Sequence, residues 1–154
     1  MPHIVLLEDD PDWESQARAA LEWAFAETLQ LELIETESQF VEELENGAFV
    51  RRPPDLFVID VMLPWDIPGP RMRPAPKGVS EDGFYRAGVR CQRRLAEISG
   101  LAQVPVVFWT IVAQDDIFRD ILKWPPNVIY LLKEPDPRHL VETVRRATGN
   151  RSGR

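Results

Sequence analysis

Short apolar runs alternate along the chain with longer stretches in which apolar residues recur every three or four positions. The short runs are typical of strands buried on both faces, and the longer stretches are typical of helices with one buried side. We therefore predict five strands, at about residues 3–7, 31–36, 56–60, 104–109 and 128–132. The predicted helices lie at about residues 11–27, 38–47, 82–98, 115–122 and 137–147. Ser38 is the expected N-cap of the second helix, and Phe84 belongs to the apolar side of the third.

The strict alternation of strands and helices predicts an α/β fold with a parallel sheet and helices on both faces. In a doubly wound, flavodoxin-like sheet of order 2-1-3-4-5, the ends of the first and third strands meet at the point where ligands bind. A length of 154 residues suits one domain. We expect this domain to cover residues 1–149 and residues 150–154 to form a flexible tail.

The segment after the third strand, residues 64–81, differs in composition from the rest of the chain. It holds five of the 14 prolines, and its basic residues are Arg71, Arg73 and Lys77. Prolines at this density break helices and strands, so we predict a loop insertion without secondary structure. A loop of this length in a compact domain is usually functional or disordered. We expect it to cover the ligand-binding edge of the sheet or to contact a partner.

Charge and composition exclude several classes of protein. With 18 basic and 25 acidic residues the net charge is −7, which argues against direct nucleic-acid binding. No apolar stretch approaches the ~18 residues that a membrane span needs, and the N-terminus lacks a secretory signal pattern. We therefore expect a cytoplasmic protein without membrane contact. Cys91 is the only cysteine, so no intrachain disulfide forms.

Four of the predicted strands run into polar residues. The first runs into Glu8 and Asp9, the third ends at Asp60, the fourth is followed by Thr110 and the fifth by Lys133. These positions share one edge of a parallel sheet. A carboxylate can attack phosphorus and form an aspartyl phosphate, and carboxylates bind Mg²⁺. A lysine and a hydroxyl would stabilise the phosphoryl oxygens, so this edge suits phosphate chemistry.

The motifs at these strand ends resemble those of the receiver domain of two-component response regulators. The resemblance covers about residues 3–148 and rests on the segments 6–10, 60–64, 82–83, 104–110 and 130–133. It implies a chemotaxis-regulator-like phosphorelay switch rather than an enzyme with turnover. Because little chain follows the last predicted helix, we expect a stand-alone receiver that acts through a downstream protein, with homodimer formation left open.

The resemblance also implies roles for individual residues. Asp60 would accept a phosphoryl group from a sensor histidine kinase or a phosphotransfer protein. Asp9 and Asp60 would bind Mg²⁺ directly, Glu8 would bind it through water, and the backbone carbonyl of Met62 would be a further ligand. The phosphoryl group would be held, and the switch operated, by Thr110, Lys133 and Tyr130.

The chain departs from the usual receiver pattern at several positions. Lys133 is followed by Glu134 before Pro135, so Glu134 is expected to compete for the lysine. Ile111 stands where receivers carry a small residue and is expected to narrow access to Asp60. The apolar residues Met62 and Val112 cannot orient a hydrolytic water, which predicts a long-lived phosphoryl group. The helix after Thr110 is short, and a partner surface is expected near Trp65 and Trp124, whereas a solvated helix face is expected for Arg90, Arg93 and Arg94.

Two alternative functions remain open. The first is a pseudo-receiver, a binding module of the same fold with little or no phosphorylation, which Ile111 and Glu134 favour. The second is a Mg²⁺-dependent phosphohydrolase with Asp60 as nucleophile. Aspartate-based phosphatases of the haloacid dehalogenase type usually carry a second acid two residues after the nucleophile, whereas this chain has Met62 there.

Overall fold

The five predicted strands form one parallel sheet. The computed structural model describes residues 1–118 and 124–149. Its strands are β1 (His3–Leu7), β2 (Gln30–Ile34), β3 (Leu56–Ile59), β4 (Val106–Thr110) and β5 (Val128–Leu132), in the order β2-β1-β3-β4-β5 with every pairing parallel. This is the predicted flavodoxin-like order, which places β1 and β3 side by side with Leu7 opposite Ile59.

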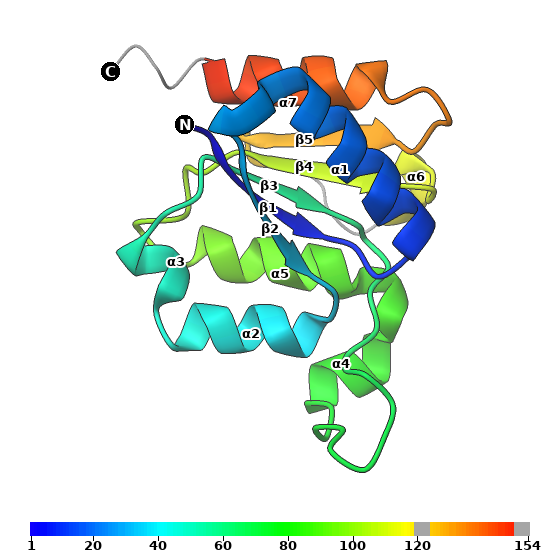
Figure 1. Cartoon of the computed structure of the whole chain (residues 1–154). Helices are drawn as coiled ribbons and strands as arrows, with labels where there is room; N and C mark the ends of the chain where they lie inside the picture. Colours follow the sequence, from blue (N-terminus) through cyan, green and yellow to red (C-terminus); the bar gives the residue numbers. More distant parts are fainter. Residues whose placement is uncertain (119–123, 150–154) are drawn as a thin grey trace.

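Helices cover both faces of the sheet. The helices α1 (Pro11–Phe25) and α7 (Arg138–Gly149) lie on one face, and α2 (Glu37–Glu45), α3 (Ala48–Arg51) and α5 (Ala87–Ala96) lie on the other (Figure 1). A short helix, α6 (Gln114–Phe118), follows β4; the part of the expected helix at residues 119–122 lies outside the described residues. No helix among the described residues is long and apolar enough to span a membrane.

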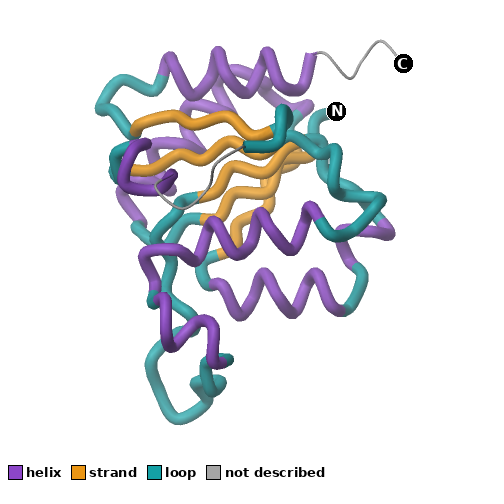
Figure 2. Tube along the Cα trace, turned by 180° about the vertical axis from the view of Figure 1, so that it is seen from behind, coloured by secondary structure: helices purple, strands orange, loops and turns teal. Residues whose placement is uncertain are grey.

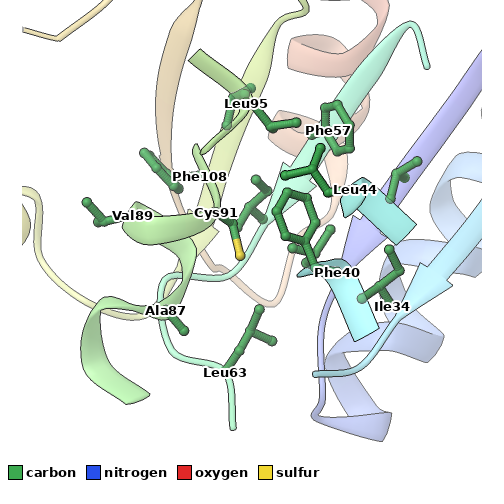
Figure 3. Packing of buried hydrophobic residues seen from close by; sticks show 14 of the residues in the cluster. Ile34, Phe40, Leu44, Phe57, Leu63, Ala87, Val89, Cys91, Leu95 and Phe108 are labelled. Atoms are coloured by element: carbon green, nitrogen blue, oxygen red, sulfur yellow. The ribbon is translucent and has the colours of Figure 1, made fainter. Parts of the chain in front are cut away.

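The two faces of the sheet bury two separate cores. Alternate strand residues such as Phe57 and Phe108 point toward α2 and α5, where they meet Phe40, Leu44, Cys91 and Leu95 (Figure 3). The intervening strand residues pack against α1 and α7 in a second cluster that includes Ile4, Leu6, Val58, Val107, Ala17, Leu21, Leu140 and Val144. Burial raises the pKa of the Cys91 thiol well above its ordinary value. The sheet is therefore covered on both faces, and its functional groups can gather only at an edge.

Side-chain caps fix where α1 and α2 begin. The carboxylate of Asp10 accepts hydrogen bonds from the backbone N–H groups of Asp12, at 2.8 Å, and Trp13, at 3.2 Å. The predicted cap of α2, Ser38, is wrong. Thr36 caps this helix instead, because its Oγ1 accepts from Gln39 N at 3.1 Å. One acid of the cluster at residues 8–12 thus serves the helix α1.

The insertion after β3 is more ordered than predicted. Its last residues form a helix, α4 (Lys77–Asp82), which corrects the expectation of a loop without secondary structure. Gly83, with φ of 71°, then ends α4, and the 3₁₀ turn η2 (Phe84–Arg86) follows. The helix that was expected from residue 82 therefore begins only at Ala87, as α5. Phe84 is therefore not in the core; it is 52% exposed and stacks on Tyr85.

Hydrogen bonds hold the insertion against α2. The backbone N–H groups of Glu37 and Ser38, at the start of α2, donate to the carbonyls of Pro64, at 3.0 Å, and Trp65, at 2.7 Å. The indole N–H of Trp65 donates to the Arg73 carbonyl at 3.0 Å, which closes the loop on itself. In Figure 2 the segment projects beyond the layers of the domain. The loop extends outward, but its base is fixed beside the carboxyl edge of the sheet.

A buried ion pair joins α2 to α5 behind this loop. The guanidinium of Arg90 donates to both carboxylate oxygens of Glu37, at 2.7–3.1 Å, and to the Gly83 carbonyl at 2.9 Å. The expectation of a solvated face is therefore wrong for Arg90, because α5 packs directly beside α2 and turns this arginine inward.

Candidate functional site

Three carboxylates meet at the carboxyl ends of β1 and β3. Glu8 and Asp9 follow β1, and Asp60 follows β3, whose last residue pairs with the last residue of β1. The backbone N–H of Asp60 donates to the Leu7 carbonyl at 3.0 Å, which continues this register. One carboxylate oxygen of each acid lies within 4.8 Å of the others. Glu8 and Asp60 are buried and Asp9 is exposed, so the cluster opens to solvent on the Asp9 side.

Lys133 approaches the same three acids from the end of β5. Its backbone N–H donates to the Thr110 carbonyl at 2.8 Å, and its Nζ lies 2.7 Å from Asp60 Oδ2 and also contacts Glu8 Oε2. Its side chain is 2% exposed. The expected competition from Glu134 is not what the structure shows, because that carboxylate is exposed and faces His139 at 4.0 Å. Lys133 is aimed at Asp60 although a proline does not follow it directly.

Negative charge exceeds positive charge in this cluster. Burial, and then repulsion from Asp60, raise the pKa of Glu8 to about 7 although Lys133 acts against the shift. The pKa of Asp9 is also raised, mainly because the site partly desolvates its carboxylate and further by repulsion from Asp60. One ammonium therefore does not offset the three carboxylates, and a second cation would stabilise their ionised forms.

Hydrogen bonds reach both carboxylate oxygens of Asp60 and one of Glu8. Asp60 Oδ1 accepts from the Met62 N–H at 3.1 Å, and Asp60 Oδ2 accepts from Lys133. Glu8 Oε1 accepts from the Asp10 N–H at 3.0 Å. Asp10 itself turns its carboxylate toward α1, which separates it from the cluster. The role of the Met62 carbonyl stays a prediction.

Thr110 and Tyr130, the predicted switch residues, both bond to Val112 in the loop after β4. Thr110 is fully buried, and its Oγ1 accepts from the Val112 N–H at 3.3 Å. The hydroxyl of Tyr130 donates to the Val112 carbonyl at 2.6 Å, and its ring packs at the edge of the core. Both side chains therefore hold the loop at residues 111–113 in place, and a movement of this loop would disturb both bonds.

A cavity of about 570 Å³ lies over the carboxylates. Asp9, Asp60, Lys133 and Ile111 line it from the sheet side. Its other wall comes mainly from the insertion and from the loop after Asp60, through Leu63, Pro64, Trp65, Asp66, Pro68, Met72, Val79 and Phe84. As predicted, the segment after β3 lies at the ligand-binding edge, and Ile111, which also lines the cavity, is 57% exposed.

Two tryptophans beside Lys133 were missed by sequence reasoning. The ammonium lies 5.4 Å from the ring centroid of Trp13 and 5.1 Å from that of Trp109. Trp109 directly precedes Thr110, and Trp13 lies in the first turn of α1, so both sit next to residues already assigned to the site. Their proximity to the predicted strand ends was the available signal.

Comparison with known proteins defines the fold. No protein-family model matches the chain, and the search of curated proteins gives no significant match. Among solved structures, a sensor protein from Polaromonas sp. JS666 is 23% identical, with 97% of each chain covered and a TM-score of 0.67. The signal receiver domain of a histidine kinase from Syntrophus aciditrophicus is 19% identical, with 100% of this chain and 95% of that chain covered and a TM-score of 0.69.

A third match bears on the metal. The receiver domain of a sensor histidine kinase from Pseudomonas aeruginosa PAO1, which has a magnesium ion coordinated in its active site cleft, is 21% identical with a TM-score of 0.64. The alignment covers 96% of this chain and 98% of that chain. At these identities the comparisons establish the fold. The chain therefore has the fold of these receiver domains along nearly its whole length, as its motifs predicted.

Proposed function

We propose that this chain is a phosphorelay switch of the cytoplasm, phosphorylated on Asp60 in a Mg²⁺-dependent reaction by a sensor histidine kinase or a phosphotransfer protein. Phosphorylation would change a surface that a downstream protein recognises. The observation that carries the proposal is the meeting of three carboxylates with Lys133 at one edge of a receiver fold. Residues 1–149 would act as one domain, with the segment 64–81 as an insertion that walls the site.

The residues at the site fit a magnesium ion. All candidate ligands are oxygens, which Mg²⁺ prefers, and burial together with repulsion from Asp60 raises the pKa of Glu8, so a cation would stabilise its ionised form. Asp9, Asp60 and the Met62 carbonyl would hold the ion directly, and Glu8 would hold it through water. When bound, Mg²⁺ supplies positive charge that stabilises phosphoryl oxygens. The ion in the cleft of the Pseudomonas receiver domain supports this assignment.

The protein side chains would carry the transfer itself. A carboxylate oxygen of Asp60 forms the new bond to phosphorus, and the phosphorus–nitrogen bond to the donor histidine breaks, with its electron pair leaving on the imidazole. Lys133, already 2.7 Å from Asp60, would donate to a phosphoryl oxygen and offset its charge. Thr110 would turn its hydroxyl toward the phosphoryl group, and Tyr130 would respond through the loop at Val112 that both residues contact.

The direct test is incubation with Mg²⁺ and acetyl phosphate, followed by intact-mass measurement. The wild type is expected to gain one phosphate, and the gain should disappear with EDTA or in Asp60→Asn. Asp10→Asn is a matched control, since an asparagine still caps α1 and the three clustered carboxylates remain. The adduct should persist for minutes, because Met62 and Val112 cannot orient water. A phosphorylated Asp60→Asn variant would overturn the assignment of the acceptor.

The pseudo-receiver is the second candidate, and one observation favours it. Ile111 lines the same cavity as Asp60, and 57% of its surface is exposed. If this side chain blocked donors, the wild type would gain no mass in the experiment above and Ile111→Ala would gain it. Steady release of phosphate from many phosphate esters would instead support the phosphohydrolase.

A further inference from the structure

The ammonium of Lys133 is enclosed by two kinds of partner. On one side lie the carboxylates of Glu8 and Asp60, and on the other lie the rings of Trp13 and Trp109. The two rings contact each other edge to face, with centroids 5.6 Å apart and planes at 85°. A cation is attracted to the face of an indole, and this attraction is strongest where water is excluded. Lys133, buried to 98% of its side chain, meets this condition.

The two rings come from elements that are themselves firmly placed. Trp109 is buried in β4 and shares the core on the α1 and α7 face. Trp13 lies in the first turn of α1, where its backbone N–H donates to the capping carboxylate of Asp10, and its side chain lines the cavity over Asp60. Trp109 therefore contacts the lysine from the core, and Trp13 contacts it from the lining of the cavity that Lys133 also lines.

The lysine needs such a restraint. Its ammonium ends a flexible four-carbon stem, so its direction is set by what surrounds it rather than by its own geometry. The residue that follows offers no competing pull, because the carboxylate of Glu134 faces His139. A ring face also attracts a cation without a fixed direction, so it can hold the ammonium while the hydrogen-bonding partner changes from Asp60 to a phosphoryl oxygen.

We propose that Trp13 and Trp109 form an indole clamp that positions the Lys133 ammonium at Asp60. Trp13 is then a positioning residue of the phosphorylation site, acting through Lys133. The consequence for phosphoryl transfer rests on the proposed function, whereas the position of the ammonium can be measured without it.

The position is measured by NMR on protein labelled at its lysines. The sequence contains three lysines, so the spectrum is simple, and Lys133→Arg assigns the signal of interest. Ring currents should shift the ε-methylene protons of Lys133 upfield of those of Lys77, whose side chain is 88% exposed. Trp13→Leu should move the Lys133 signal toward the Lys77 value, and Trp13→Phe should retain part of the shift. No response to Trp13→Leu would overturn the clamp.

The effect on the reaction is measured as the rate of phosphorylation by acetyl phosphate in Mg²⁺. Trp13→Leu should lower the maximal rate about tenfold, because misplacing a reacting group slows the step that uses it. The acetyl phosphate concentration at half-maximal rate and the Mg²⁺ affinity should stay near wild type, since Lys133 does not ligate the metal. Trp13→Phe should recover most of the rate. Trp23→Leu, also in α1 but 82% exposed, is the matched control and should leave the rate unchanged.

The two measurements separate the possible failures. If the wild type forms no phosphate adduct, the proposed function fails, while the NMR shift still decides whether the clamp exists. If the NMR signal moves in Trp13→Leu and the rate does not, the clamp has no positioning role in phosphoryl transfer. If Trp13→Leu does not fold, the graded comparison of wild type with Trp13→Phe decides both questions, and equal shifts and equal rates would overturn the proposal.

Discussion

Two buried clusters of charge flank the backbone at residues 60–64 and differ in how their charges are matched. Between α2 and α5, the guanidinium of Arg90 donates several hydrogen bonds to the single carboxylate of Glu37. At the carboxyl edge of the sheet, the single ammonium of Lys133 contacts the carboxylates of Glu8 and Asp60, and the carboxylate of Asp9 lies close by. The first cluster is balanced, and the second carries an excess of negative charge; burial, and then repulsion from Asp60, raise the pKa of Glu8 there to about 7.

The difference separates a structural ion pair from a binding site. A balanced pair has no net charge that would attract another ion, and the Arg90–Glu37 pair holds the start of α2 beside the start of α5. A cluster with excess charge is costly to keep buried unless a further cation arrives. The unbalanced cluster also opens into the cavity over Asp60, whereas Glu37 is 1% exposed.

Breaking the balanced pair should have the largest effect on stability. Glu37→Gln leaves the Arg90 charge buried without its counter-charge, which typically costs about 3–5 kcal/mol. Urea denaturation should therefore show a large fall in the free energy of unfolding. Because neither Glu37 nor Arg90 lines the cavity over Asp60, a Glu37→Gln protein that remains folded should still bind Mg²⁺. A loss below about 1 kcal/mol would contradict the structural role of the pair.

Removing a charge from the unbalanced cluster should have the opposite sign. A carboxyl whose pKa is raised on folding stabilises the fold below its ordinary pKa and loses that contribution as pH rises. For Glu8 the window runs from 4.5 to about 7, which corresponds to a loss on the order of 3 kcal/mol across it. Glu8→Gln should lack this decline, so it should be more stable than the wild type at pH 8 in EDTA. Saturating Mg²⁺ should narrow the gap. If the stability of the wild type and of Glu8→Gln changed with pH in the same way in EDTA, folding would not raise the pKa of Glu8.

The unbalanced cluster was more accessible to sequence reasoning than the balanced one. In a parallel sheet the residue after each strand lies at the same edge, so Glu8, Asp60 and Lys133 could be brought together from strand positions alone. Glu37 and Arg90 lie 53 residues apart on two helices, and their contact depends on how α2 and α5 pack. The helix α4 was missed because prolines dominate its segment, although Lys77 to Asp82 follow the last of them.

Gly88 connects the two clusters and should respond to substitution with an intermediate effect. It lies two residues before Arg90, and a Cβ at this position would be 2.4 Å from the Asp60 carbonyl and 2.8 Å from Val61 Cα. Gly88→Ala must therefore move α5 or the backbone of Asp60, at a cost of about 1–3 kcal/mol. Phosphorylation by acetyl phosphate should slow as well.

Gly78→Ala is the control for this substitution. Gly78 lies in α4 with nothing within 4 Å of its Cβ position, so alanine should leave stability equal or slightly higher. Full stability and a normal phosphorylation rate in Gly88→Ala would mean that the backbone of Asp60 is not held by α5.

The smallest effect is expected from an exposed ion pair on the same helix as Glu37. Glu42 contacts Arg73 of the insertion at 2.6 Å, but both side chains are about half exposed. Solvent screens such a pair and already solvates each partner, so Glu42→Gln should leave the urea midpoint within error of the wild type. Glu37→Gln and Glu42→Gln make the same chemical change on one helix and differ in burial. Equal losses of stability in the two variants would mean that burial does not distinguish these ion pairs. Only the charge excess around Glu8 would then separate the binding cluster from the structural pair.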